Sequence, residues 1–93
     1  MVKLLKVVRS TNPKKKYTAL FDNGKKTSFG DATAQDYTQH HDRDRREAYR
    51  RRHEVDLDTD DPTRAGFLSY YILWGDSINI DTNIAAYKRR FNM

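Results

Sequence analysis

The feature that most constrains the fold is the dipeptide Asn23-Gly24, because Asn-Gly between two strand-like segments is the strongest short-range signal for a β-hairpin. Residues 16–21 before it alternate along the chain as in a half-buried strand, and residues 26–29 after it supply a partner strand. A two-residue type I′ turn needs positive φ at both central positions, and Asn and Gly tolerate this best. We therefore predict a hairpin closed by a two-residue turn.

The segment before the hairpin predicts a third strand. Residues 2–9 are rich in Val and Leu, and a turn around Pro13 separates them from the hairpin. Residues 31–41 are a polar connection, in which we expect one helical turn near residues 34–37. The sequence thus predicts a three-stranded antiparallel sheet over residues 2–29.

The second half of the chain predicts helices. Residues 42–53 contain strong helix formers and no breaker, but few apolar side chains, so this helix should lie on the surface. An acidic loop should follow, up to Asp61. Asp61 and Pro62 are a good N-cap and first helical residue, and Gly75 is a good C-cap. The helix between them is apolar nearly all round and should be the central element of the core.

Asp81 or Thr82 should be the N-cap of a last helix. The elements together predict an α+β fold, with an N-terminal three-stranded antiparallel sheet (residues 2–29) followed by about three helices (residues 42–91). With 93 residues, the chain should form a single domain over residues 1–93 with a small core. In the last helix we expect Ile84, Ala85, Tyr87 and Phe91 to point inward, and Lys88, Arg89 and Arg90 to point outward.

Composition excludes several classes of protein. The chain has no Cys, which excludes a disulfide scaffold and a zinc site with thiolate ligands. No segment approaches the roughly 20 apolar residues that a membrane span needs. The N-terminal segment is interrupted by Lys3, Lys6 and Arg9 and is too short for a signal peptide, so we expect an intracellular protein.

The chain contains no motif that indicates catalysis or metal binding. Asp56, Asp58 and Asp60 have the spacing of the start of a calcium loop, but the Gly and Glu that such a loop needs further on are missing. The three histidines lack the spacing of metal ligands, and neither a nucleophile elbow nor a Gly-rich phosphate loop is present. We therefore predict that the protein is not an enzyme and uses no metal, cofactor or small-molecule substrate.

Charge is distributed unevenly along the chain. The formal net charge is +5. Residues 1–29 carry eight Lys or Arg against one Asp, and residues 40–53 carry six Arg against three acidic residues. Five acidic residues then lie within residues 54–61. Such a chain attracts polyanions, but it can also pair with copies of itself or with a mixed-charge neighbour.

The arginine-rich segment allows two interpretations, which the sequence leaves open. Arg binds phosphate and carboxylate bidentately, so this segment can form a nucleic-acid face together with the lysines of the first turn. Alternatively, it is a solvated helix whose charges pair internally, between Glu47 and arginines three or four residues away, and with the acidic loop. Trp74 is expected to belong to the core and not to a base-stacking platform. The candidate residues for binding a partner or a polyanion are Lys14, Lys15, Lys16, Arg43, Arg45, Arg46, Arg50, Arg51, Arg52, Lys88, Arg89 and Arg90.

Four segments occur in a fixed order along the chain: KYTALFDNGKKTSFG, DYTQHHDRDRREAYRRRH, DPTRAGFLSYYILWG and IAAYKRRF. In this order they resemble a family of small proteins found in nucleocytoplasmic large DNA viruses. The family motif Y-T-x-x-F-x-N-G-K-K-x-x-F-G is similar to residues 17–30, and its D-Y/F-T-x-H-x-D segment is similar to residues 36–42. Its Arg/Lys-rich helix ending in R-H resembles residues 43–53, and its T-x-A-G-F-x-S-x-x-L-W block resembles residues 63–74.

This resemblance implies a viral origin and a location in the virion, or in the host cytoplasm or nucleus during infection. It carries over no catalytic residues. The leading hypothesis is a non-enzymatic structural or interaction protein, a small capsid-associated or internal virion protein whose partners are other virion proteins such as a major capsid protein. The alternative is a nucleic-acid-binding protein that acts on viral DNA or RNA through the Arg-rich helix.

Overall fold

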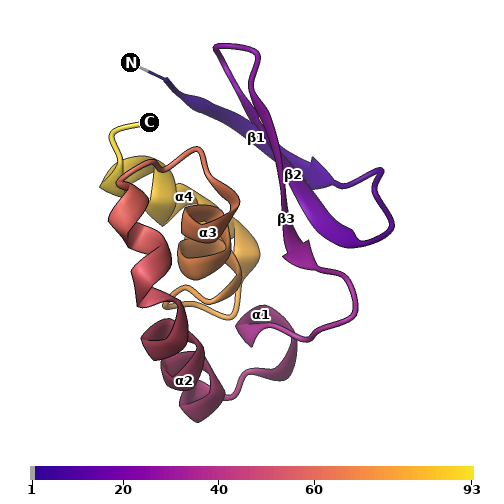
Figure 1. The fold of residues 1–93 in the computed structure, drawn as a ribbon, viewed down its shortest axis with the longest axis vertical. Helices are drawn as coiled ribbons and strands as arrows, with labels where there is room; N and C mark the ends of the chain where they lie inside the picture. The colour runs from indigo at the N-terminus through magenta and orange to yellow at the C-terminus, as the bar shows by residue number, and fades with distance from the viewer. Residues whose placement is uncertain (1) are drawn as a thin grey trace.

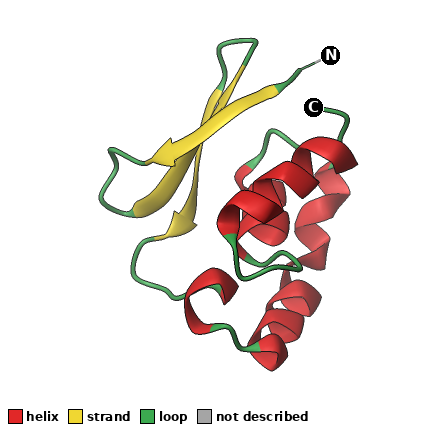
Figure 2. Cartoon of the chain, turned by 180° about the vertical axis from the view of Figure 1, so that it is seen from behind, coloured by secondary structure: helices red, strands yellow, loops and turns green. Residues whose placement is uncertain are grey.

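The structure is a computed structural model that describes residues 2–93, and its strands all precede its helices (Figure 1). β1 (Leu4–Arg9), β2 (Lys15–Phe21) and β3 (Lys26–Asp31) form an antiparallel sheet in the order β1-β2-β3. The helical segments pack on one side of this sheet (Figure 2). The predicted α+β fold is therefore confirmed.

The turn between β2 and β3 differs from the prediction. Phe21 N–H donates to the Lys25 carbonyl at 2.9 Å, so three residues, and not two, close the hairpin. Gly24 has a φ of 89°, whereas Asn23 stays outside the left-handed region. The Asn23 side chain instead accepts from Lys25 N–H at 3.0 Å and stabilises the longer loop. The hairpin and the conformation of Gly24 were predicted correctly, but the two-residue type I′ turn was wrong.

Six helical segments follow the sheet. The predicted surface helix is α2, and Asp42 caps it by accepting from the N–H groups of Asp44 and Arg45. Asp36 caps the short helix before it, which lies slightly later than the predicted turn at residues 34–37. The segments are α1 (Tyr37–His40), α2 (Arg43–His53), the 3-10 helix η1 (Glu54–Thr59), α3 (Ala65–Leu68), the π-helical turn η2 (Ser69–Leu73) and α4 (Ile80–Arg90).

The acidic segment and the start of the central helix correct two predictions. The predicted acidic loop is the helix η1, which ends where Asp60 adopts a φ of 52°. Asp61 does not cap the central helix, because its side chain accepts from the N–H and hydroxyl of Thr63 in a local turn. The helix therefore begins only at Ala65, and the residue before it makes no side-chain cap.

The central helix also ends differently from the prediction. Trp74 N–H donates to the Ser69 carbonyl at 3.0 Å, five residues back, so its last turn is π-helical. Gly75 is buried and is not in the left-handed conformation of a C-cap glycine. In α4, Asn79 is the N-cap and not Asp81 or Thr82, and the exposed Ala85 does not point inward as predicted.

The core lies between the sheet and the segment α3–η2, so the predicted central position of this segment is confirmed. Gly30, with a φ of 84°, lets β3 approach this segment, because a Cβ there would lie 2.7 Å from the Cδ1 atom of Leu73. The polar side chain of Asn83 is also buried, and it donates to one carbonyl of η2 and to one of the loop between η2 and α4. The buried residues of this core cluster are Leu4, Ala19, Phe21, Phe29, Phe67, Leu68, Ile72, Leu73 and Tyr87.

Candidate nucleic-acid interface

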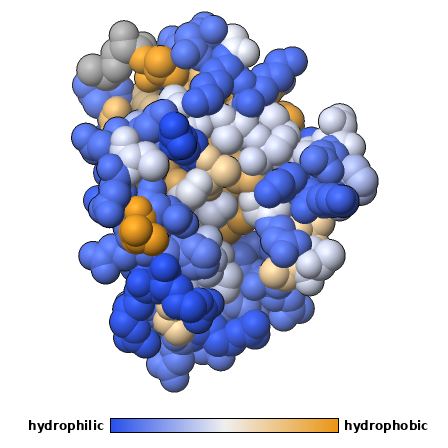
Figure 3. Space-filling model, viewed as in Figure 1, coloured by the Kyte–Doolittle hydropathy of each residue, from blue (hydrophilic) through white to orange (hydrophobic). Residues whose placement is uncertain are grey.

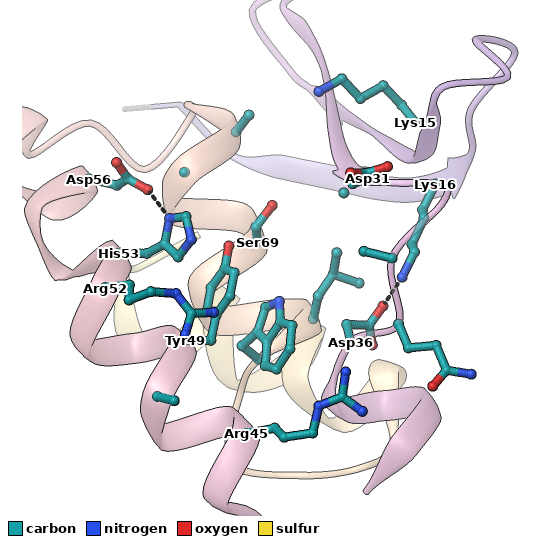
Figure 4. A pocket seen from close by; sticks show the side chains of 18 residues that line it. Lys15, Lys16, Asp31, Asp36, Arg45, Tyr49, Arg52, His53, Asp56 and Ser69 are labelled. Atoms are coloured by element: carbon teal, nitrogen blue, oxygen red, sulfur yellow. Dashed lines mark hydrogen bonds and ion pairs between the residues drawn. The ribbon is translucent and has the colours of Figure 1, made fainter. Parts of the chain in front are cut away.

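A cleft of about 600 Å³ lies between the sheet and α2 (Figure 4). Lys15 and Lys16 of β2 line one wall, and Arg45 and Arg52 of α2 line the other. These four residues belong to two basic segments that are about 30 positions apart in the sequence. Folding therefore brings part of the lysine turn and part of the arginine helix to one site.

The face of α2 that borders the cleft follows helical spacing. Arg45, Tyr49 and Arg52 are separated by four and three residues, so their side chains project from the same side of the helix. Arg45 and Arg52 are exposed, and neither forms an ion pair within residues 2–93. Both guanidinium groups are therefore available to an external anion.

Arg46, by contrast, is part of the packing of the protein. Only 8% of its surface is exposed, and its guanidinium lies over the ring of Tyr37 at 4.8 Å from the centroid. It pairs with Glu47 at 2.9 Å and donates to the Asp76 carbonyl. Glu47 was expected to pair with arginines three or four residues away, so this adjacent pair corrects that prediction.

Arg50 also fixes α2 in place. Its Nε donates to the Trp74 carbonyl at 2.9 Å, and its Nη2 contacts Asp76 Oδ1 at 3.0 Å. The hydrogen bond from Arg50 lowers the pKa of Asp76 below its ordinary value. The guanidinium also lies 5.9 Å from the ring centroid of Tyr70. Two of the six candidate arginines of α2 therefore hold the helix against the chain that follows η2.

The three lysines of the first turn have different surroundings. Lys16 Nζ lies 2.6 Å from Asp36 Oδ2 and 2.5 Å from Gln39 Oε1, so it ties the sheet to α1. Lys14 and Lys15 are exposed, but only Lys15 lines the cleft. Of the three, Lys15 is the one that lies beside the cleft with no ion pair in the described chain.

The basic residues at the end of α4 do not line the cleft. The Arg90 guanidinium lies 4.7 Å from the ring centroid of Tyr71, and with Arg50 it borders a separate hollow of about 230 Å³. Arg89 is exposed and Lys88 is half-buried. The twelve predicted residues therefore do not form one continuous site.

Three aromatic rings form a stack along the inner side of α2, and a fourth packs on it at a tilt; sequence reasoning did not identify this cluster. Trp74 and Tyr49 are parallel within 5°, with their centroids 4.2 Å apart, and Tyr49 stacks in turn on His53 at 4.1 Å. His40 packs against Trp74 at 5.3 Å. Burial raises the pKa of Tyr49 to about 12, although its hydrogen bond with Ser69 acts in the opposite direction. The spacing of Tyr49 and His53, four residues apart on one predicted helix, was the sequence signal that could have predicted their contact.

This stack determines how the aromatic residues meet the cleft. Trp74 is half-buried and packs against the core, as expected. Tyr49 covers one face of the Trp74 ring, and His40 packs on the ring at an interplanar angle of 54°. The rings therefore contribute mainly their edges to the cleft.

Three carboxylates also line the cleft. Asp36 is paired with Lys16, and Asp56 lies 3.0 Å from His53 Nδ1. Hydrogen bonds from Thr33 lower the pKa of Asp31. Within residues 2–93, no arginine of α2 pairs with the acidic segment 54–61, so the pairing that the second interpretation of the arginine-rich segment supposed is absent there.

The described residues contain neither a metal-binding cluster nor a membrane-spanning helix. No group of three or more His, Asp or Glu side chains in residues 2–93 is placed to hold a metal ion. No helix in this range combines the length and the apolar composition needed to cross a bilayer.

The fold and the cleft define a small, basic α+β protein with a cleft between its sheet and its first long helix that four lysines and arginines and three carboxylates line. The chain matches a family of unknown function (DUF5754) over residues 5–53, just over half its length, and it belongs to that family. The matched region runs from β1 through α2 and includes Lys15, Lys16, Arg45 and Arg52. No curated protein and no solved structure matches the chain.

Proposed function

We propose that this is a non-enzymatic nucleic-acid-binding protein that contacts phosphates through the cations of the cleft. One observation carries the proposal: Arg45 and Arg52 of α2 and Lys15 of the sheet border the same cleft, and all three lack an ion-pair partner among the described residues. Arginine and lysine that are not neutralised within the protein can release the counterions of a phosphate backbone, which is the main source of nucleic-acid affinity.

The surface around the cleft also favours a charged ligand. Figure 3 shows hydrophilic side chains over most of one face of the molecule, with apolar residues scattered and not gathered into a patch. The large exposed apolar residues, Leu5, Val55 and Ile78, come from three separate elements or loops. Docking of an apolar protein surface would need a contiguous apolar patch, so electrostatic recognition is the better supported mode.

The number of free cations sets the expected salt dependence. About three phosphate contacts correspond to a slope of log affinity against log salt near −2 for single strands and −2.7 for duplex DNA. Affinity should then fall about 20- to 40-fold between roughly 50 and 200 mM salt. Fluorescence anisotropy of labelled DNA and RNA measures both quantities.

A matched pair of variants tests whether the cleft is the binding site. Arg45→Ala/Arg52→Ala removes two arginines that line the cleft, and Arg43→Ala/Arg51→Ala removes two exposed arginines of the same helix that do not. The first variant should reduce the salt slope by about 1.4 to 1.8, and the second should reduce it much less. Equal losses would contradict a cleft-centred site, and no binding by the wild type would contradict the function.

A second candidate is the small capsid-associated or internal virion protein that bridges other virion proteins. The observation that favours it is the position of Asp58 and Asp60, which are exposed on and after η1, directly following the basic helix α2. Adjacent surfaces of opposite charge suit pairing with a mixed-charge neighbour.

The double variant Asp58→Asn/Asp60→Asn separates the two candidates without disturbing the paired carboxylates Asp56 and Asp61. Asn also tolerates the left-handed conformation of Asp60. Nucleic-acid binding by the wild type, changed little in the variant, supports the first candidate. Binding only by the variant supports the second, because the arginines would then normally serve carboxylates.

A further inference from the structure

We infer that the cleft receives an unpaired nucleobase, so that the ligand of this interface is single-stranded nucleic acid. The inference rests on the proposed function and specifies its ligand. It follows from the size of the cleft, from the arrangement of charge in it and from the orientation of its aromatic rings.

The size of the cleft suits one nucleoside unit. Its volume of about 600 Å³ lies within the range of sites that enclose small molecules. A base within a duplex is stacked and paired and presents only its edges in the grooves, so it cannot enter such a cleft without leaving the helix. A base in a single strand can enter without that cost.

The charges are arranged as a nucleotide requires. Arg45 and Arg52 lie along the α2 wall, and Lys15 lies at the edge of the sheet wall with its side chain directed away from that of Lys16 (Figure 4). The two arginines can hold phosphates along α2, and Lys15 can hold a phosphate outside the sheet edge. The carboxylates of Asp31 and Asp56 also line the cleft. Carboxylates repel phosphate but accept hydrogen bonds from the amino groups of bases. The backbone of the strand is therefore expected at the cationic rim and the base between the walls.

The aromatic stack indicates how the base is held. Tyr49 lies between Trp74 and His53, so its two faces are covered and an entering base meets ring edges. Recognition in the cleft therefore depends on hydrogen bonds and on fit more than on stacking. Trp74 is the single tryptophan of the chain and lines the cleft, so its fluorescence reports directly on occupancy.

Four ligands of equal length test the inference: a single-stranded DNA, a single-stranded RNA of the same sequence, the matching duplex, and an abasic strand that carries the phosphates without bases. At least one single strand should bind about tenfold or more tighter than the duplex and the abasic strand. That strand should also change the Trp74 fluorescence, whereas the abasic strand should not. Comparison of DNA with RNA identifies which of the two the protein prefers.

A cleft-filling variant supplies the second test. Ala34 lines the cleft and Ala32 does not, although both are exposed in the same loop. Ala34→Phe should lower single-strand affinity about tenfold and leave binding of the abasic strand unchanged, and Ala32→Phe should change neither.

Two results would overturn the inference: equal affinity for the single strands and the abasic strand, or equal effects of the two alanine variants. If binding still depended on Arg45 and Arg52 in that case, the proposed function would stand without the base-binding cleft. Absence of binding to all four ligands would instead remove the proposed function itself.

Discussion

The buried side chain of Asn83 offers the sharpest test of how the second half of the chain is held together. Only 2% of its surface is exposed. Its Nδ2 group donates to the carbonyls of Ile72 and Ser77, both at 2.8 Å, and its Oδ1 atom accepts from Ser77 N–H at 3.0 Å. One amide in the first turn of α4 therefore satisfies one backbone carbonyl of η2 and two backbone groups of Ser77 in the following loop.

The expected cost of Asn83→Ala follows from these three bonds. Each hydrogen bond contributes about 0.5–1.5 kcal/mol net, and a buried group left without a partner costs about 1–3 kcal/mol. We expect a total loss near 3 kcal/mol, because water can reach part of the loop around Ser77, which is only half-buried. That is a large part of the roughly 5–14 kcal/mol typical of a chain of this length.

Urea denaturation followed by circular dichroism measures this loss. The matched control is Asn79→Ala, in which an exposed asparagine of the same helix loses its single capping bond to Thr82 N–H. The control should lose about 1 kcal/mol. If Asn83→Ala cost no more than Asn79→Ala, the argument that a buried amide organises this connection would be refuted.

Three further predictions concern the hairpin, the aromatic stack and pH. Gly24→Val should lower the free energy of unfolding by about 1–2 kcal/mol, because valine is strained at positive φ and a Cβ at this position would contact no other atom. A thermal unfolding curve that matched the wild type would contradict this prediction. Trp74→Ala should cost about 2–4 kcal/mol in urea denaturation, because it removes a half-buried ring stacked on Tyr49. Burial lowers the pKa of His40 from 6.5, so the unfolded chain binds more protons below that pH. Stability should therefore fall as the pH drops through 6.5, and His40→Asn, which retains an acceptor for Asp42 N–H, should weaken this dependence of unfolding free energy on pH.

The comparison of α2 with the central helix shows where local sequence suffices. The start of α2 is encoded by Asp42 and the residues just after it, and its length follows from an unbroken run of helix formers. In the central helix, Asp61 and Pro62 gave an equally good local signal. There the Asp61 side chain bonded to Thr63 instead, and the helix began later. A helix cap and a local turn with Thr63 would each supply hydrogen bonds to the Asp61 carboxylate. The residues near Asp61 in the sequence therefore do not determine which of the two forms.

The candidate site likewise combines features that the local sequence determines with features that depend on tertiary packing. The sequence by itself determined the β-hairpin, the arginine-rich helix and the presence of two basic segments, because each depends on residues close together in the chain. Only the tertiary structure decided that Arg46 and Arg50 face inward, toward Tyr37, Trp74 and Asp76. It also decided which cations share one cleft, because that depends on how the sheet and α2 pack across the core. Identical residue types on one helix thus acquire different roles from contacts that are distant in sequence.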